Sequence, residues 1–111
     1  MKTSYFAKAK NIYGANLVSI ALKTPPGFKG TIYTKLAPTY DLLAKWKSGN
    51  MTEEEYTKEY KIILNKLDPH KIYQQLGEDA ILLCYEKSGE FCHRHIVAEW
   101  FNDVGYKVEE L

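Results

Sequence analysis

The sequence has few cysteines and no long apolar segment. Two cysteines among 111 residues are too few for the disulfide framework of a small secreted protein. No stretch approaches the roughly 18 apolar residues that a membrane-spanning helix needs, and residues 1–10 lack an apolar run of signal-peptide length. We therefore expect a cytoplasmic protein, without membrane contact, whose cysteines are thiols rather than a disulfide.

The sequence also lacks an excess of one charge. Fifteen basic and fourteen acidic residues give a formal net charge of +1, so no strong field attracts nucleic acid or anionic lipid. A local basic and aromatic cluster could still stack on and neutralise a single nucleic-acid strand. A helix with its aromatic side chains inward and its lysines in water explains the same residues, which are Tyr33, Lys35, Tyr40, Lys45, Trp46 and Lys47.

Several enzyme signatures are missing. There is no glycine-rich dinucleotide fingerprint, no phosphate loop ending in Gly-Lys-Ser or Gly-Lys-Thr, no paired-histidine zinc-protease motif and no nucleophile elbow. These absences disfavour the corresponding enzyme classes, and we expect no cofactor.

The composition that is present suits one packed domain. Apolar residues make up 45% of the chain, which is enough for a continuous core at this length. No repeat or linker-like stretch divides the sequence. We expect residues 1–111 to form a single domain.

The first third of the chain predicts two short strands and a long loop. Residues 3–9 and 17–22 are rich in β-branched and aromatic side chains and are bounded by turn formers. The roughly seven residues between them are fewer than a parallel crossover normally needs, so the sequence leaves their relative direction open. Residues 23–38 contain three prolines and two glycines and predict an irregular loop.

The remainder alternates helices with strands. Helices are predicted over residues 40–48, from Thr52 with a capping box at Glu55, and from Asp68-Pro69 to a stop at Gly77. A strand over 80–86, a helix over 92–104 and a short strand over 106–108 follow. This order predicts an α/β fold with an open, mostly parallel sheet flanked by helices in three layers.

The strand over 80–86 is nearly continuously apolar, which is typical of a central strand buried on both faces. Because side chains alternate, Cys84 and Glu86 share one face near its carboxyl end. Ligands of open α/β sheets bind at that edge. We therefore place the candidate site where this strand meets the helix that begins near Cys92, with His93 and Arg94 in its first turn.

Arg94 has two interpretations. A cation in the first turn of a helix opposes the helix dipole, so it indicates either a bound anion or an internal partner. In the first case Arg94 and free backbone N–H groups hold a small anionic ligand, such as a nucleotide-like molecule. In the second case Arg94 pairs inside the protein with a glutamate such as Glu86.

The two cysteines are also open to two interpretations. Cys92, at a helix start, could be a nucleophile with a lowered pKa, with His93 and Glu86 as acid, base or orienting groups. A capping thiol is the alternative, since neighbouring residues on a helix diverge by about 100° and His93 need not touch Cys92. Cys84 is either a ligand contact or a small core residue.

Zinc is a weaker hypothesis. Cys84, Cys92, His93 and His95 offer sulfur and nitrogen ligands, but their spacing differs from that of structural zinc sites and the two histidines diverge on one helix. We predict no metal. Lys23 and Lys29, with Tyr40 and Asp41, could close over a ligand as a lid, but solvated lysines and an ordinary first-turn aspartate are the preferred interpretation.

Part of the sequence resembles a known family. A strand ending in Cys-x-Glu, a short loop and a helix opening with Cys-His-Arg are its signature, and they are present here as Leu83-Cys84-Tyr85-Glu86, Glu90-Phe91-Cys92-His93-Arg94-His95 and Ala98-Glu99-Trp100. In these motifs the chain resembles the bacterial, archaeal and phage family called domain of unknown function 488. The resemblance implies a Rossmann-like α/β sandwich with no settled activity.

The resemblance extends less specifically along the chain. Many relatives begin with a Thr-Ile-Gly-His-Ser type of strand, whereas this chain has Thr3-Ser4-Tyr5-Phe6, so no role of that histidine carries over. Ser4 and Tyr5 are nevertheless candidate ligand contacts. Two functions follow: an enzyme or ligand-binding domain for a small anion, or a non-catalytic adaptor in which the Cys, Glu, His and Arg side chains form a structural polar lock. The oligomeric state stays open.

Overall fold

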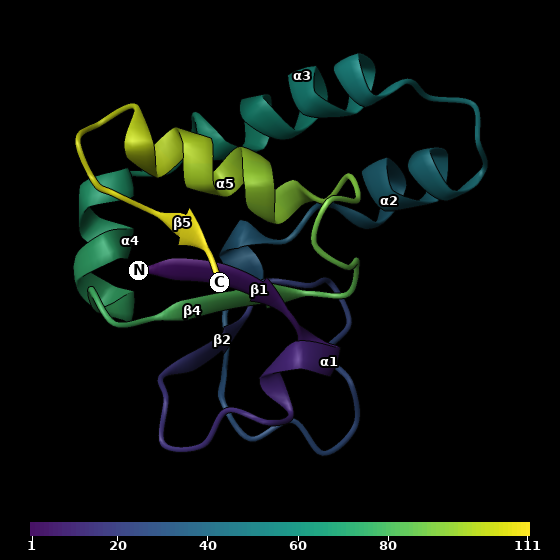
Figure 1. The fold of residues 1–111 in the computed structure, drawn as a ribbon. Coiled ribbons are helices and arrows are strands. Elements are labelled where there is room, and N and C mark those ends of the chain that lie inside the picture. Colours follow the sequence, from purple (N-terminus) through teal and green to yellow (C-terminus); the bar gives the residue numbers. More distant parts are fainter.

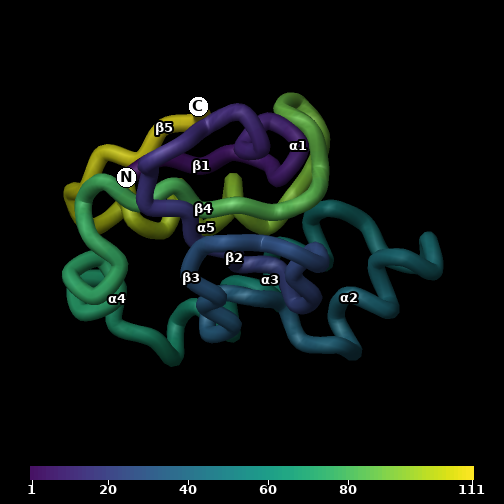
Figure 2. Tube along the Cα trace, turned by 90° about the horizontal axis from the view of Figure 1, so that it is seen from below, coloured from purple at the N-terminus to yellow at the C-terminus, as the bar shows by residue number.

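The computed structural model describes residues 1–111 and contains a five-stranded sheet in which every paired strand is parallel. The order across the sheet is β3-β2-β4-β1-β5, which Figure 2 shows along the backbone trace. The apolar strand predicted to be central is central, and the two N-terminal strands run parallel to it on either side. The strands are β1 (Lys2–Tyr5), β2 (Leu17–Ser19), β3 (Thr31–Ile32), β4 (Ile81–Cys84) and β5 (Glu109–Glu110).

Helices cover both faces of this sheet, as predicted for a three-layer α/β sandwich. Four helices lie over one face, while the short α1 lies on the other (Figure 1). None of the helices is long and apolar enough to cross a membrane. The helices are α1 (Phe6–Ala9), α2 (Tyr40–Lys47), α3 (Glu53–Leu64), α4 (Pro69–Leu76) and α5 (His93–Asn102), with a 3-10 turn, η1, at Thr34–Leu36.

The sequence signals for the helices are confirmed. The side chain of Thr52 accepts from the backbone of Glu55 and the Glu55 carboxylate accepts from the Thr52 backbone, which completes the capping box of α3. Asp68 caps α4, and Gly77 ends it with a φ of 97° that favours glycine. These caps fix where α3 and α4 begin, and the buried residues of both helices belong to the larger core cluster.

The alternation along β4 divides the core in two. Ala80 and Leu82 belong to the larger cluster under α2 to α5, whereas Ile81 and Leu83 belong to a smaller cluster with Phe6. Side chains two residues apart share a face, so Cys84 points toward α5, as predicted. This alternation is what directs the end of β4 into the candidate site.

Three local predictions were wrong. Residues 6–9 form α1 rather than continuing the strand, because Phe6 and Ala9, three apart, both pack into the smaller cluster. The predicted loop contains β3 and η1. The last strand is Glu109–Glu110 rather than 106–108, since Tyr106 stacks on Tyr73 with ring centroids 3.9 Å apart.

Candidate active site at the end of β4

The candidate site is formed by two chain segments that meet at the carboxyl edge of the sheet. Cys84 is the last residue of β4, and Cys92 is the N-cap of α5. Cys92 has extended backbone geometry and its side chain makes no capping hydrogen bond. The strand therefore delivers one cysteine and the helix start delivers the other.

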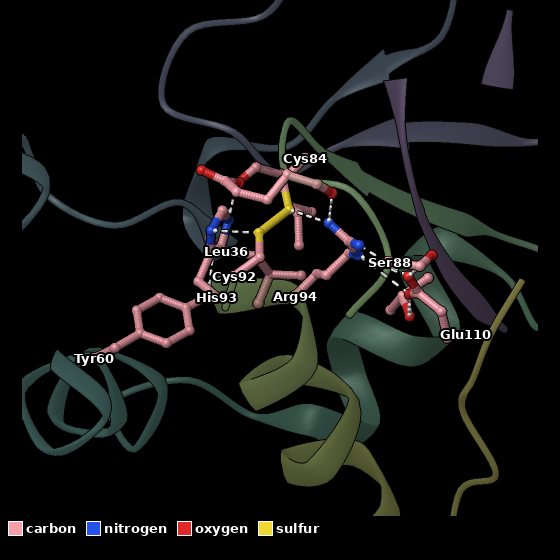
Figure 3. Close-up of a disulfide and its surroundings, with 11 residues drawn as sticks. Leu36, Tyr60, Cys84, Ser88, Cys92, His93, Arg94 and Glu110 are labelled. Atoms are coloured by element: carbon pink, nitrogen blue, oxygen red, sulfur yellow. Dashed lines mark hydrogen bonds and ion pairs between the residues drawn. A yellow bond between two sulfur atoms is a disulfide. The ribbon is translucent and has the colours of Figure 1, made fainter. Parts of the chain in front are cut away.

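The sulfur atoms of Cys84 and Cys92 are bonded as a disulfide, so the expectation of two thiols was wrong for this structure. That expectation rested on the compartment and on the cysteine count. Neither of these shows that Cys84 at the strand end and Cys92 at the helix N-cap face each other across the loop 85–91. Figure 3 shows the disulfide with His93 on one side and Arg94 on the other.

Arg94 is fully buried and makes only internal contacts. Its Nη1 donates to Cys84 Sγ at 3.0 Å and to the backbone oxygen of Glu86 at 2.6 Å. Its Nε and Nη2 donate to the carboxylate of Glu110, the closest contact being 2.8 Å. The internal-pair interpretation of Arg94 therefore describes the structure, but the partner is Glu110 and not the side chain of Glu86.

Glu110 is held as a carboxylate by several donors. Burial alone raises its pKa, but hydrogen bonds from Arg94, Thr3 and Ser88 outweigh that effect and lower the pKa to about 2. The Arg94 guanidinium carbon also lies 5.8 Å from the centre of the Tyr5 ring, at cation–π distance. A buried guanidinium is tolerated here because its charge is matched and its N–H groups have partners.

His93 is neutral, and its tautomer is fixed by a backbone contact. Nε2 lies 2.7 Å from the carbonyl oxygen of Ile20, and a carbonyl can only accept, so the proton sits on Nε2. Burial lowers the His93 pKa to about 4, with Arg94 and His95 adding to the lowering and the Ile20 contact opposing it. Nδ1 is left as an acceptor.

The free nitrogen of His93 faces the disulfide. Nδ1 lies 3.7 Å from Cys92 Sγ, although the sequence argument held that neighbouring helix residues need not touch. The divergence of about 100° applies to two helical residues, whereas Cys92 is the extended N-cap. On its far side the imidazole packs edge-on to Tyr60, whose hydroxyl donates to the Leu36 carbonyl.

A cavity of about 470 Å³ opens beside the disulfide. Cys84 and His93 form part of its wall, while Glu86, Tyr40 and two exposed lysines, Lys23 and Lys47, also line it. Its volume suits a small ligand. Cys92 is absent from this wall and borders instead a void of about 20 Å³ near Trp46 and Phe91.

Some predicted contacts lie elsewhere. Ser4 is fully buried on the face of β1 that points away from Arg94, and its hydroxyl has no hydrogen-bond partner. Lys29 lines a different cavity beside α1, and Tyr5 contacts Arg94 rather than the cavity. Trp46 packs between Tyr56 and Phe91, so it offers no exposed platform for stacking a nucleic-acid base.

Two residues of the site were missed by sequence reasoning. Glu110 contacts Arg94 only because β5 pairs with β1, a long-range arrangement without a local signal. Lys47 was treated as a solvated lysine, and its place on the cavity wall depends on the position of α2. The available clue to the position of Lys47 was its place next to Trp46. Because Trp46 is expected to point inward, the helical periodicity sets the direction of the Lys47 side chain.

The sulfur and nitrogen atoms also define where a metal could bind. One ligand atom each from Cys84, Cys92 and His93 lies within 4.8 Å of the others, whereas the sequence argument had relied on His93 and His95 diverging. Thiolates, not disulfide sulfurs, bind zinc. Metal binding at these three residues would therefore require reduction first.

Comparison with known proteins gives one match. The family model described as DUF488-N3a, the active DUF488-N3 subclade, matches residues 12–105. The matched segment contains both cysteines, His93 and Arg94. No curated protein and no solved structure matches the chain.

Proposed function

Because the chain belongs to the DUF488 family, we propose that this domain is a cysteine-dependent enzyme that binds a small anionic substrate in the cavity at the end of β4. The observation that carries the proposal is the contact between Arg94 Nη1 and Cys84 Sγ at 3.0 Å, because Cys84 is one of the residues that line that cavity.

The proposed nucleophile is Cys84 rather than Cys92. In the reduced protein the Arg94 guanidinium would stabilise a Cys84 thiolate, since a neighbouring cation lowers a thiol pKa. Arg94 shares its charge with Glu110, yet its Nη1 faces the sulfur directly. Cys92 instead faces a neutral imidazole and is not among the residues that line the cavity, so the neighbouring charge and the position beside the cavity favour Cys84.

The anionic character of the substrate rests on Lys23 and Lys47. Both are exposed at the cavity, which has otherwise mostly apolar walls, and Glu86 is the one carboxylate among the lining residues. Arg94, the anion ligand first considered, is enclosed and already paired. The lysines would therefore attract the anionic group while the apolar wall holds the remainder of the ligand.

A non-catalytic adaptor is the competing function. The enclosure of Arg94 by Glu110, Cys84 and the Glu86 backbone favours it, because such a cluster joins strand to helix without any ligand. It requires no reactive thiol and no preference for anions. Chemical labelling therefore separates the two functions.

The test is to alkylate the reduced protein with limiting iodoacetate or iodoacetamide, the first anionic and the second neutral. Trypsin cuts after Lys71, Lys87 and Arg94, so Cys84 and Cys92 fall in separate peptides and mass spectrometry can read each one. We expect Cys84 to react first, with a midpoint pH well below about 8.5. We also expect the ratio of the iodoacetate rate to the iodoacetamide rate to be higher for Cys84 than for free cysteine.

Matched variants sharpen the test. Lys23→Gln and Lys47→Gln should each reduce the preference for iodoacetate by about two- to threefold, because one cavity charge is lost. Lys66→Gln, exposed on a loop that does not line the cavity, should leave the preference unchanged. Equal and ordinary labelling of both cysteines would contradict the proposal and favour the adaptor.

A further inference from the structure

We propose that Cys84 and Cys92 act together as a dithiol that reduces small anionic disulfides, with Cys84 attacking the substrate and Cys92 resolving the mixed disulfide. This inference rests on the proposed function in taking Cys84 as the nucleophile. It goes further by giving Cys92 a chemical role and by naming the substrate class. The oxidised pair in the structure is the product state of this reaction.

The surroundings of the two sulfurs differ in the way such a reaction needs. Cys84 Sγ receives a hydrogen bond from a permanent cation and borders the cavity. Cys92 Sγ faces the unprotonated nitrogen of His93 and does not border the cavity. A molecule in this cavity therefore lies next to Cys84 and not next to Cys92.

Cys92 is within reach for the second step, because the two sulfurs are bonded in the structure. The resolving sulfur needs no rearrangement of distant elements, since it approaches from the N-cap of α5 while β4 holds Cys84. Both cysteines are buried, with 1% of Cys84 and 4% of Cys92 exposed, so the two thiols are distinguished by the cavity wall and the neighbouring charge rather than by exposure. These features distinguish a resolving cysteine from a second independent nucleophile.

The first step exchanges one sulfur–sulfur bond for another. The Cys84 thiolate attacks one sulfur of the substrate RS–SR, the substrate bond breaks, and RS⁻ leaves with the electron pair. The product is a mixed disulfide between Cys84 and one half of the substrate. The anionic groups of both halves would lie near Lys23 and Lys47.

The second step releases the other half of the substrate. Cys92 passes its proton to His93 Nδ1 and attacks Cys84 Sγ, forming the Cys84–Cys92 bond and expelling a second RS⁻. His93 lines the cavity and then loses the proton to water. The substrate gains two electrons and the protein loses two, so two equivalents of a small thiol must reduce the pair before another cycle.

The reaction is tested with 5,5′-dithiobis(2-nitrobenzoate), an anionic disulfide whose released half is coloured. Added in equimolar amount to the reduced chain, it should release two coloured thiolates and leave a protein two hydrogens lighter than the reduced form. Cys92→Ser should release only one and keep the adduct in the peptide that contains Cys84. Cys84→Ser should react at least tenfold more slowly.

His93→Gln tests the positioning of the second step. The variant should slow release of the second thiolate several-fold, leave the first nearly unchanged, and flatten the dependence of the second phase on pH. His95→Gln is the matched control, because His95 lies on the same helix but has no contact with either sulfur among the hydrogen bonds of the site. Equal effects of both variants would remove His93 from the mechanism.

Other outcomes separate this inference from the proposed function. If Cys84 is labelled first but wild-type protein keeps an adduct on each cysteine, the resolving role is wrong and the cysteine-dependent function stands. If Cys92 is labelled first, both fail. Peptide mapping of wild-type protein with substoichiometric reagent gives this order even where a cysteine variant does not fold.

Discussion

The disulfide separates two sides of the site that are held in different ways. On the Arg94 side, formed by Arg94, Glu110, Thr3 and Ser88, the buried charge of Arg94 is matched by Glu110 and the hydrogen bonds join these residues to one another. On the His93 side, formed by His93 and the cavity wall, the groups are neutral next to the sulfur and open to a cavity. We therefore expect the first side to hold the fold, and in the proposed function the second side would bind the ligand.

Arg94→Ala should cause the largest loss of stability. It removes a fully buried charge and leaves Glu110, Cys84 Sγ and the Glu86 carbonyl without their donor. Breaking a buried pair of this kind costs about 3–5 kcal/mol. Urea unfolding with both proteins oxidised measures the loss, and a change below about 1 kcal/mol would mean that the Arg94 side does not hold the fold.

Acidification should destabilise the protein through His93. Its pKa is 6.5 in the reference state and about 4 when folded, so the unfolded chain binds the proton more readily and stability falls as the pH drops from about 6.5 toward 4. The full effect is about 3 kcal/mol. When melting temperature is measured against pH, it should fall less between about pH 6.5 and 4 in His93→Gln than in wild type, while His95→Gln should keep the wild-type dependence. Parallel curves for His93→Gln and wild type would refute the assignment.

Glu110→Gln should have a smaller effect. The amide still accepts from Arg94, but the charge is lost, and Glu110 is partly exposed, so we expect a loss of about 1 kcal/mol at neutral pH. The lowered pKa means that the carboxylate contributes stability above about pH 4.5 and loses it as the pH falls toward 2. Acid unfolding of variant and wild type should therefore converge near pH 2. If the stability difference between Glu110→Gln and wild type stayed constant with pH, the negative charge of Glu110 would not be its cause.

Lys47→Gln should have the smallest effect on stability, within about 0.5 kcal/mol, because the side chain is exposed and makes no hydrogen bond or ion pair. Calorimetry of the variant beside Lys66→Gln gives the comparison. A large loss for Lys47→Gln alone would mean that the cavity wall is structural, and it would erase the contrast between the two sides.

Local patterns in the sequence were sufficient to predict which residues lie together at the end of β4. The apolar run of β4, its alternation and the Cys-His-Arg start of α5 placed Cys84, Cys92 and Arg94 at one edge of the sheet. What they did not give is the partner of each group. Glu110 reaches Arg94 through the pairing of β5 with β1, and Ile20 reaches His93 from the end of β2, so both depend on contacts far apart in the chain.

The shortest elements were the least predictable for a related reason. A run such as Phe6–Ala9 is compatible with strand or helix, and the packing of Phe6 against Phe28 and Tyr85 favours the helix. The cysteine pairing likewise depends on how the N-cap of α5 is oriented, which is a tertiary feature. Composition and cysteine count carry no information about it.

The bond between Cys84 and Cys92 closes a covalent ring around the loop 85–91, which supplies Tyr85 and Glu86 to the cavity wall. Closing a ring of this size restricts the unfolded chain by about 2–3 kcal/mol. Each change of oxidation state would thus tighten or release one wall of the cavity, and amide hydrogen exchange in this loop should be faster in the reduced protein. The oxidation state of the two sulfurs would therefore set how rigid this wall of the cavity is.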